Sequence, residues 1–170
     1  MQERTGVITF KGNGLTLQGQ PVEVGQQAPD FTVIGNDLSP VKLTDHTGSV
    51  VVLSSVPSLD TPTCDTQTRT FNEKVAGLDG VKVLTVSMDL PFAQSRWCGN
   101  AGVENVVTVS DHRDADFGVK YGMLIKELRL LARGVFVLDS QGKIAYIELV
   151  KEVAEEPDYD AALEAVKQLL

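Results

Sequence analysis

Residues 57–69 decide the fold of this chain, and they read Pro57-Ser58-Leu59-Asp60-Thr61-Pro62-Thr63-Cys64-Asp65-Thr66-Gln67-Thr68-Arg69. They follow residues 50–56, an apolar and largely β-branched run that is typical of a buried strand. Beyond Pro62, apolar residues recur at spacings of four and three, as on one face of a helix. We therefore predict a strand that ends near Val56, a loop, and a helix that begins near Pro62.

Cys64 lies in the first turn of that predicted helix. Thr61 is a suitable N-cap residue, and a proline at the first helical position gives up no hydrogen bond. Free backbone N–H groups and the positive end of the helix dipole meet at this turn and stabilise a thiolate. Asp60 and Asp65 oppose this effect, so we expect a cation nearby, and the local sequence offers only Arg69. Cys64 is either a reactive thiol or a small buried apolar residue.

The remaining pattern is that of an α/β protein. In order, we predict a β-hairpin from residues 6–10 and 15–18, short strands at 30–34 and 41–43, buried strands at 81–88 and 106–109, a short helix at 92–97 that ends at Cys98, a short helix near 115–118, an antiparallel hairpin from 134–139 and 143–150, and a closing helix from Pro157. This is the order of a thioredoxin-like fold, with a mixed central sheet flanked by helices. The N-terminal hairpin is expected as an addition at one edge. A chain of 170 residues suits a single domain, 1–170.

Composition and charge exclude several classes of function. The net charge is −8 and the basic residues form no stripe, so we expect no binding to nucleic acid or anionic lipid. No apolar run approaches the ~20 residues that span a bilayer, and no apolar signal core begins the chain, so a cytoplasmic location is expected.

Cys64 and Cys98 are too far apart for a Cys-x-x-Cys motif. With His46 and His112 they form no zinc-like spacing, and we read both histidines as surface loop residues.

Two further residues are candidates for chemistry at the same edge of the sheet. Sites in open α/β sheets lie beyond the carboxyl ends of the strands, where residues 57–63 are expected. Arg133 precedes the strand at 134–138, and if that strand is antiparallel to its neighbours, Arg133 lies at this edge. It is then either the missing cation or a solvated edge residue. Cys98 is either a second reactive thiol or a packing residue beside Trp97.

A thiolate that faces a cation, a hydroxyl and backbone amides is suited to peroxide reduction. It attacks one peroxide oxygen, and donors such as Arg133 and Thr61 stabilise the charge that moves onto the leaving oxygen. The product is a sulfenic acid, which condenses with a second thiol to a disulfide. Cys98 is the only other thiol of the chain. A disulfide needs Cα atoms within about 7 Å, so the segments around both cysteines must loosen if they start farther apart.

With these residues identified, the chain resembles the peroxiredoxins, and among them the bacterial thiol peroxidases with two cysteines in one chain. The peroxiredoxin pattern Pro-x-x-x-Thr-x-x-Cys is met by Pro57, Thr61 and Cys64. The blocks that resemble the thiol peroxidase subgroup are residues 58–68, 87–94, 96–98 and 131–133, with similar stretches at 7–13 and 25–31. The resemblance therefore runs from end to end.

This resemblance implies a role for each candidate. Cys64 is the peroxidatic cysteine, Thr61 bonds the thiolate and the peroxide, and Pro57 shields the site from solvent. Arg133 is the family arginine, and Cys98 resolves the sulfenic acid within the same chain. The family also implies a homodimer, thioredoxin as reductant, and both hydrogen peroxide and organic hydroperoxides as substrates, with a preference for the organic ones. The expected reaction cycle needs no metal, flavin or haem cofactor. Two alternatives stay open: a general thiol–disulfide oxidoreductase, and a non-catalytic binding or holdase protein with structural cysteines.

Overall fold

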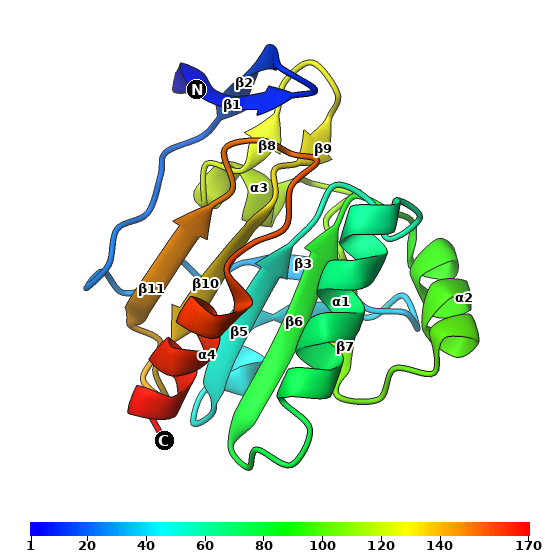
Figure 1. Ribbon diagram of the computed structural model, residues 1–170, viewed down its shortest axis with the longest axis vertical. Helices are drawn as coiled ribbons and strands as arrows, with labels where there is room; N and C mark the ends of the chain where they lie inside the picture. The colour runs from blue at the N-terminus through cyan, green and yellow to red at the C-terminus, as the bar shows by residue number, and fades with distance from the viewer.

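The computed structural model describes residues 1–170, and its strands form two sheets (Figure 1). The larger sheet has seven strands in the order β11-β10-β5-β6-β7-β3-β4. Its parallel centre consists of β5 (Val50–Ser55), β6 (Val81–Ser87) and β7 (Val106–Ser110). The antiparallel strands on either side are β3 (Thr32–Ile34), β4 (Pro40–Lys42), β10 (Gly134–Leu138) and β11 (Ile144–Leu149).

The smaller sheet stands at one end of the molecule, where the first strands lie over the rest of the chain (Figure 1). It has the order β1-β2-β8-β9 and is antiparallel throughout. The strands are β1 (Glu3–Phe10), β2 (Asn13–Gln18), β8 (Leu124–Ile125) and β9 (Leu130–Leu131). Only two residues separate the end of β9 from the start of β10, so the chain passes directly from the smaller sheet into the larger one.

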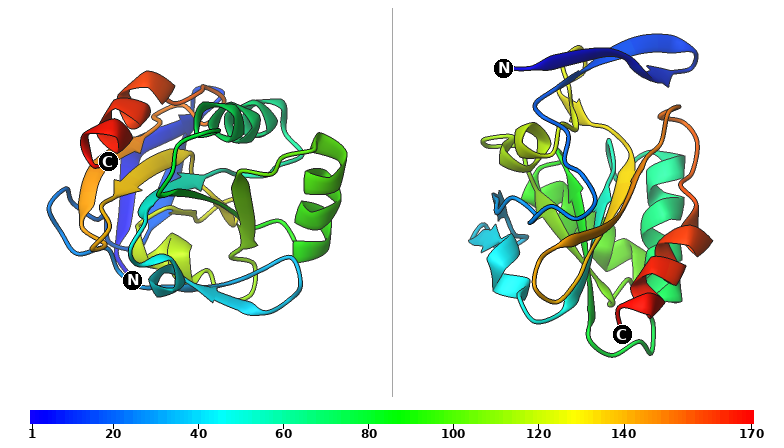
Figure 2. Two further views of the ribbon diagram at one scale, coloured as in Figure 1. Left: turned by 90° about the horizontal axis from the view of Figure 1, so that it is seen from below. Right: turned by 90° about the vertical axis from the view of Figure 1, so that its left-hand side faces the viewer.

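Helices cover both faces of the larger sheet (Figure 2). One face carries α1 (Pro62–Lys74), α2 (Pro91–Ala101) and α4 (Tyr159–Gln168), and the other carries α3 (Asp116–Lys120) with the short 3₁₀ helix η1 (Leu43–His46). Valines of β5, β6 and β10 pack beneath α1 and α4 in one apolar cluster. A larger cluster on the opposite face joins the sheet to α3 and to the N-terminal hairpin through Ile8 and Leu17. None of the helices combines the length and apolar character that crossing a bilayer requires.

The structure confirms the thioredoxin-like fold and the N-terminal hairpin. Lys11 and Gly12 form the hairpin turn with φ of 51° and 81°, as a tight two-residue turn requires. The predicted position of the hairpin at an edge of the central sheet is wrong, since β2 pairs with β8 in the separate sheet. Leu17, opposite Ile125, buries its side chain there completely. Strands of two residues, such as β8 and β9, are too short to show a periodic pattern in the sequence.

The prediction for α2 was also partly wrong. The helix continues past Cys98 to Ala101, and Gly102, with φ of 68°, provides the left-handed C-cap that ends it. Its N–H donates to the Cys98 carbonyl at 3.0 Å. Gly99 therefore lies within the helix, at a cost of about 1 kcal/mol relative to alanine, which is small enough for tertiary contacts to outweigh.

A buried carboxylate, Asp111, fixes the start of α3. It is 2% exposed and accepts the backbone N–H groups of Phe117 and Gly118 at 3.1 and 2.8 Å. Burial, with a further contribution from the charge of Asp116, raises the pKa of Asp111 to about 6. Because this value exceeds the pKa of an unfolded-chain aspartate, the folded state favours the protonated form. The associated stability is present at low pH and is lost as the pH rises through 6.

This pKa leads to a prediction for the Asp111→Asn variant. Relative to that variant, the wild-type free energy of unfolding is expected to fall by ~3 kcal/mol between about pH 4 and pH 7. Urea unfolding of both proteins across this range measures the difference. Asp114→Asn, at an exposed position three residues away, is the control and should show no such trend. A difference between wild type and Asp111→Asn that stays constant with pH contradicts the prediction.

Candidate active site

The predicted site forms where the buried strand β5 ends and α1 begins. Cys64 lies in the first turn of α1 and is 0% exposed. Thr61 occupies the N-cap position with extended backbone angles, but its side chain does not cap the helix. Its hydroxyl lies instead 2.7 Å from Cys64 Sγ and 3.0 Å from the Ser58 carbonyl oxygen. The helix start predicted from the sequence therefore holds a hydroxyl donor against the thiol.

Arg133 supplies the cation at this thiol. It is 2% exposed, and its Nη2 lies 3.3 Å from Cys64 Sγ. The strand that follows it, β10, is antiparallel to β5 with Gly134 opposite Ser55, so Arg133 lies at the edge that the sequence predicted. The guanidinium therefore brings a fixed positive charge and an N–H donor against the sulfur. The other reading of Arg133, a solvated edge residue, is wrong.

Two contacts that the sequence analysis missed hold the guanidinium in place. Gln67 Oε1 accepts from Nη1 of Arg133 at 3.0 Å, and the Val153 carbonyl accepts from Nε at 2.8 Å. Gln67 is fully buried and donates to Ser54 Oγ at 2.8 Å. Cys64 and Gln67 are three residues apart, which places both on one face of the helix. This spacing is the sequence signal from which the role of Gln67 could have been predicted. Nothing near Val153 in the sequence indicated its role.

The segment that carries Val153 crosses between α1 and the N-terminal hairpin. The Thr63 hydroxyl donates to the Ala154 carbonyl at 3.1 Å. On the other side, Glu152 Oε1 accepts from the Thr9 hydroxyl at 3.1 Å and from the Gly12 N–H at 2.9 Å. The hairpin that precedes the thioredoxin-like part of the chain thus braces the backbone that orients Arg133.

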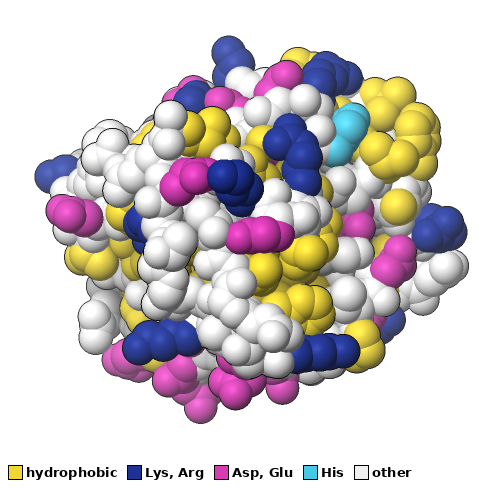
Figure 3. Space-filling model, turned by 90° about the horizontal axis from the view of Figure 1, so that it is seen from above, with side chains coloured by type: hydrophobic (Ala, Val, Ile, Leu, Met, Phe, Trp, Pro, Cys, Tyr) yellow, Lys and Arg dark blue, Asp and Glu magenta, His cyan; other side chains and the backbone are white.

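An apolar pocket of about 330 Å³ opens beside the thiol. Pro57, Thr61 and Arg133 line it together with residues of the hairpin, of 125–130 and of 153–154. Its apolar walls include Phe10, Pro62, Ile125, Leu128, Leu130 and Val153. Seen from above, the hairpin end of the molecule exposes apolar groups between charged side chains of both signs, with no stripe of basic charge (Figure 3). The pocket therefore offers a path for a small and largely apolar molecule.

The two aspartates that flank Cys64 are paired with other cations. Asp65 Oδ2 accepts from Nε of Arg69 at 2.9 Å, and Asp60 Oδ2 lies 3.9 Å from Nη2 of Arg96. Arg69, the cation that the local sequence offered, thus faces Asp65 and not the thiol. Its role as the expected counter-charge of Cys64 is wrong, and the strand β10 supplies that charge from a distant part of the sequence.

Cys98 packs against the small apolar cluster that contains Cys64, but the two cysteines form no disulfide. Both cysteines are free thiols. Cys98 Sγ faces β7, where it lies 3.3 Å from the Thr108 hydroxyl, which donates in turn to Asn36 Oδ1 at 3.1 Å. To form a disulfide with Cys64, the Cys98 sulfur must leave this contact with Thr108.

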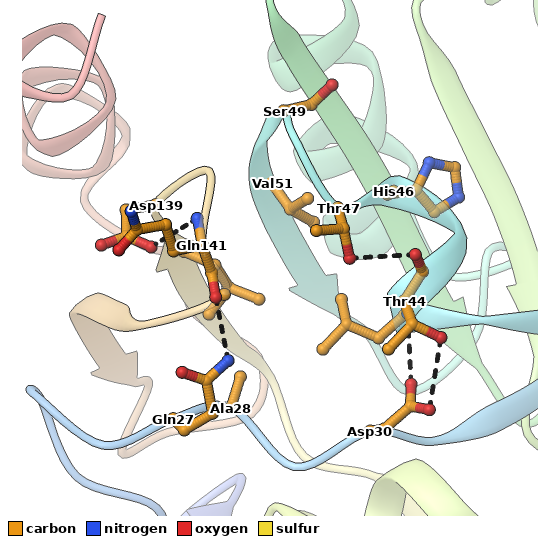
Figure 4. A pocket seen from close by; sticks show the side chains of 13 residues that line it. Gln27, Ala28, Asp30, Thr44, His46, Thr47, Ser49, Val51, Asp139 and Gln141 are labelled. Atoms are coloured by element: carbon orange, nitrogen blue, oxygen red, sulfur yellow. Dashed lines mark hydrogen bonds between the residues drawn. The ribbon is translucent and has the colours of Figure 1, made fainter.

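A second pocket, of about 50 Å³, lies at the opposite end of β5 and contains no cysteine (Figure 4). Thr44 donates its N–H and its hydroxyl to Asp30 at 3.2 and 3.4 Å, and Gln27 donates to the Gln141 carbonyl at 2.9 Å. His46 lies on its wall and is half-buried, which lowers the pKa of the imidazole. The polar groups of this pocket bind mainly to one another, so we assign it no part in the chemistry.

Comparison with known proteins identifies the family. The redoxin family model matches residues 23–163. Thiol peroxidases of Halalkalibacterium halodurans and Bacillus subtilis are 59% and 56% identical over 163 residues, which cover 96% of this chain and 98% of each relative. A peroxiredoxin-like protein from Aquifex aeolicus has a crystal structure that superposes with a TM-score of 0.92 at 46% identity, covering 98% of both chains. The chain therefore belongs to the redoxin family and, within it, to the bacterial thiol peroxidases, which are peroxiredoxin-type enzymes.

Proposed function

We propose that this thiol peroxidase reduces hydrogen peroxide and organic hydroperoxides through Cys64, and that Cys98 resolves the product within the same chain. The observation that carries the proposal is the position of Cys64 Sγ, 2.7 Å from the Thr61 hydroxyl and 3.3 Å from the Arg133 guanidinium. Both donors also line the adjoining apolar pocket, so they can bind a peroxide and the thiolate together. The apolar walls favour organic hydroperoxides.

In the first step, the Cys64 thiolate attacks the terminal oxygen of the hydroperoxide. An S–O bond forms as the O–O bond breaks, so sulfur is oxidised and the peroxide is reduced. The Cys64 sulfur retains the transferred OH as a sulfenic acid, and the leaving alkoxide takes a proton from solvent. Arg133 and Thr61 donate to the oxygens on which negative charge develops. Pro57, in the pocket wall, limits the access of water to the thiolate.

In the second step, the sulfur of Cys98 attacks the sulfenic sulfur of Cys64. An S–S bond forms, and the hydroxyl group leaves as water with the proton of the Cys98 thiol. An external dithiol then reduces the disulfide by exchange, and we propose thioredoxin for this part. From the family likeness we also propose a cytoplasmic homodimer, and one catalytic domain over residues 1–170.

The burial of Cys64 disfavours a general thiol–disulfide oxidoreductase. The thiol is 0% exposed, so a protein disulfide reaches Sγ only after a larger rearrangement than a small peroxide needs. An insulin-reduction assay separates the two activities, and we expect no activity in it.

One equivalent of cumene hydroperoxide tests both cysteine roles. Wild-type protein is expected to lose two free thiols and two mass units as the disulfide forms, because each turnover oxidises the cysteine pair once. Cys98→Ser should instead trap a sulfenic acid at Cys64, visible as a gain of one oxygen. Free-thiol titration and intact mass measure both results. Two surviving thiols in the wild type contradict the peroxidase mechanism, and a disulfide in Cys98→Ser contradicts resolution within one chain.

A further inference from the structure

We propose that Asp65 and Trp97 form a latch between α1 and α2 whose opening limits the rate of disulfide formation. This inference rests on the proposed roles of Cys64 and Cys98. The indole Nε1 of Trp97 donates to Asp65 Oδ1 at 2.9 Å. Asp65 directly follows Cys64 and Trp97 directly precedes Cys98, so one hydrogen bond joins the neighbours of the two reacting residues.

The latch is reinforced from both sides. Arg69, one turn further along α1, holds the other oxygen of Asp65 at 2.9 Å. Its guanidinium also lies over the Trp97 ring, 5.5 Å from the ring centre, and its Nη1 is 3.4 Å from the Ala101 carbonyl. Trp97 as a whole residue is 8% exposed and belongs to a small apolar cluster with Val56, Leu59 and Cys64. Trp97 is therefore fixed to the helix that carries the peroxidatic cysteine by a hydrogen bond, a cation and packing.

Little else of apolar character holds α2 in place. Its buried side chains are Pro91, Gln94 and Trp97, and Cys98 and Ala101 are only partly buried against the cluster that contains Trp97. Gln94 donates to Ser87 Oγ and to the Val109 carbonyl, while its own buried Oε1 has no hydrogen-bond partner. Cys98 lies against the Thr108 hydroxyl. Since apolar burial is small, the contacts of Trp97 are a large share of what keeps α2 folded.

Disulfide formation and the latch exclude each other. Consecutive helical residues point about 100° apart, which sends Trp97 toward α1 and Cys98 toward β7. For Cys98 to reach Cys64, α2 must unwind or rotate, and Trp97 must then leave Asp65. The latch thus sets how long the sulfenic acid persists, and with it the chance that a second peroxide oxidises Cys64 to the sulfinic acid.

The test is a double-mutant cycle on the rate of disulfide formation after one equivalent of hydrogen peroxide. Asp65→Ala and Trp97→Phe each remove the same hydrogen bond, and each is expected to speed disulfide formation by about tenfold, as loss of one hydrogen bond to a charged group implies. The double variant should be no faster than the faster single variant. Asp65→Asn keeps an acceptor for the indole and should stay near the wild-type rate.

Two further readouts separate a latch from a general loss of structure. The latch variants should form less sulfinic acid at a given excess of peroxide, and amide hydrogen exchange in residues 91–101 of the reduced protein should accelerate. Glu73→Ala, which removes an exposed charge from α1 that forms no ion pair, should change neither. Rates within twofold of wild type in both single variants, or additive effects in the double variant, would overturn the latch. If the wild type loses no thiols at all, the proposed function falls together with the latch. If the wild type and the single variants form the disulfide at the same measurable rate, only the latch is overturned.

Discussion

Replacing Arg133 by alanine is expected to lower the second-order rate of Cys64 oxidation by about a thousandfold, since the loss of one preorganised donor already costs 10²–10³ in known enzymes. Arg133 contributes twice in the proposed mechanism, because its guanidinium contacts the Cys64 sulfur before the reaction and donates to the peroxide during it. Stopped-flow oxidation of the reduced protein by cumene hydroperoxide measures this rate. The proposed role of Arg133 in peroxide reduction requires a large decrease in this oxidation rate.

The Arg133→Lys variant shows whether geometry or charge alone is at work. The three donors of Arg133 bind Cys64 Sγ, Gln67 Oε1 and the Val153 carbonyl in one plane, which a single ammonium group cannot reproduce. We expect the lysine variant to lose about a hundredfold, as for one missing donor. Thermal unfolding of both variants is the control, because a buried arginine leaves unpaired acceptors when removed. A variant that stays folded and reacts within a few-fold of wild type contradicts the assignment.

The sequence predicted the half of this site that local rules determine. A threonine N-cap followed by proline predicts the start of α1, and that start places Thr61 and Cys64 together. Topology placed Arg133 at this edge, since a strand antiparallel to β5 begins where β5 ends, but only the family resemblance chose it over a solvated edge residue. The helix start follows from a short segment of sequence, and the position of Arg133 follows from a rule of sheet connection. Each rests on a strong physical constraint.

The parts that the sequence did not predict depend on tertiary contacts. The carbonyl of Val153 is a backbone group, and every residue type carries one, so no pattern of side chains could indicate it. The small sheet consists partly of two-residue strands that exist because Leu17 and Ile125 pack together. The length of α2 was missed for a similar reason, since its polar inner face lacks the apolar period by which helices are recognised.

The hydroxyl of Thr61 gives the second large effect that we expect. Thr61→Val removes this hydroxyl with little change of shape, and should lower the rate of Cys64 oxidation by about a hundredfold. The hydroxyl has a single hydrogen, which it can donate to the thiolate at 2.7 Å or to the Ser58 carbonyl at 3.0 Å. When the peroxide binds, the same donor can turn toward its oxygen. The rate is measured by stopped flow under the conditions used for Arg133→Ala.

Loss of a helix cap cannot explain such an effect, because the Thr61 side chain makes no capping bond to α1. Thr61→Ser keeps the hydroxyl and should retain most of the activity, while Thr66→Val, at an exposed position of the same helix, controls for the change of residue type. If Thr61→Val reacts as fast as Thr61→Ser, the hydroxyl has no part in the first step. The guanidinium of Arg133 and the backbone amides at the start of α1 would then have to stabilise the leaving oxygen without it.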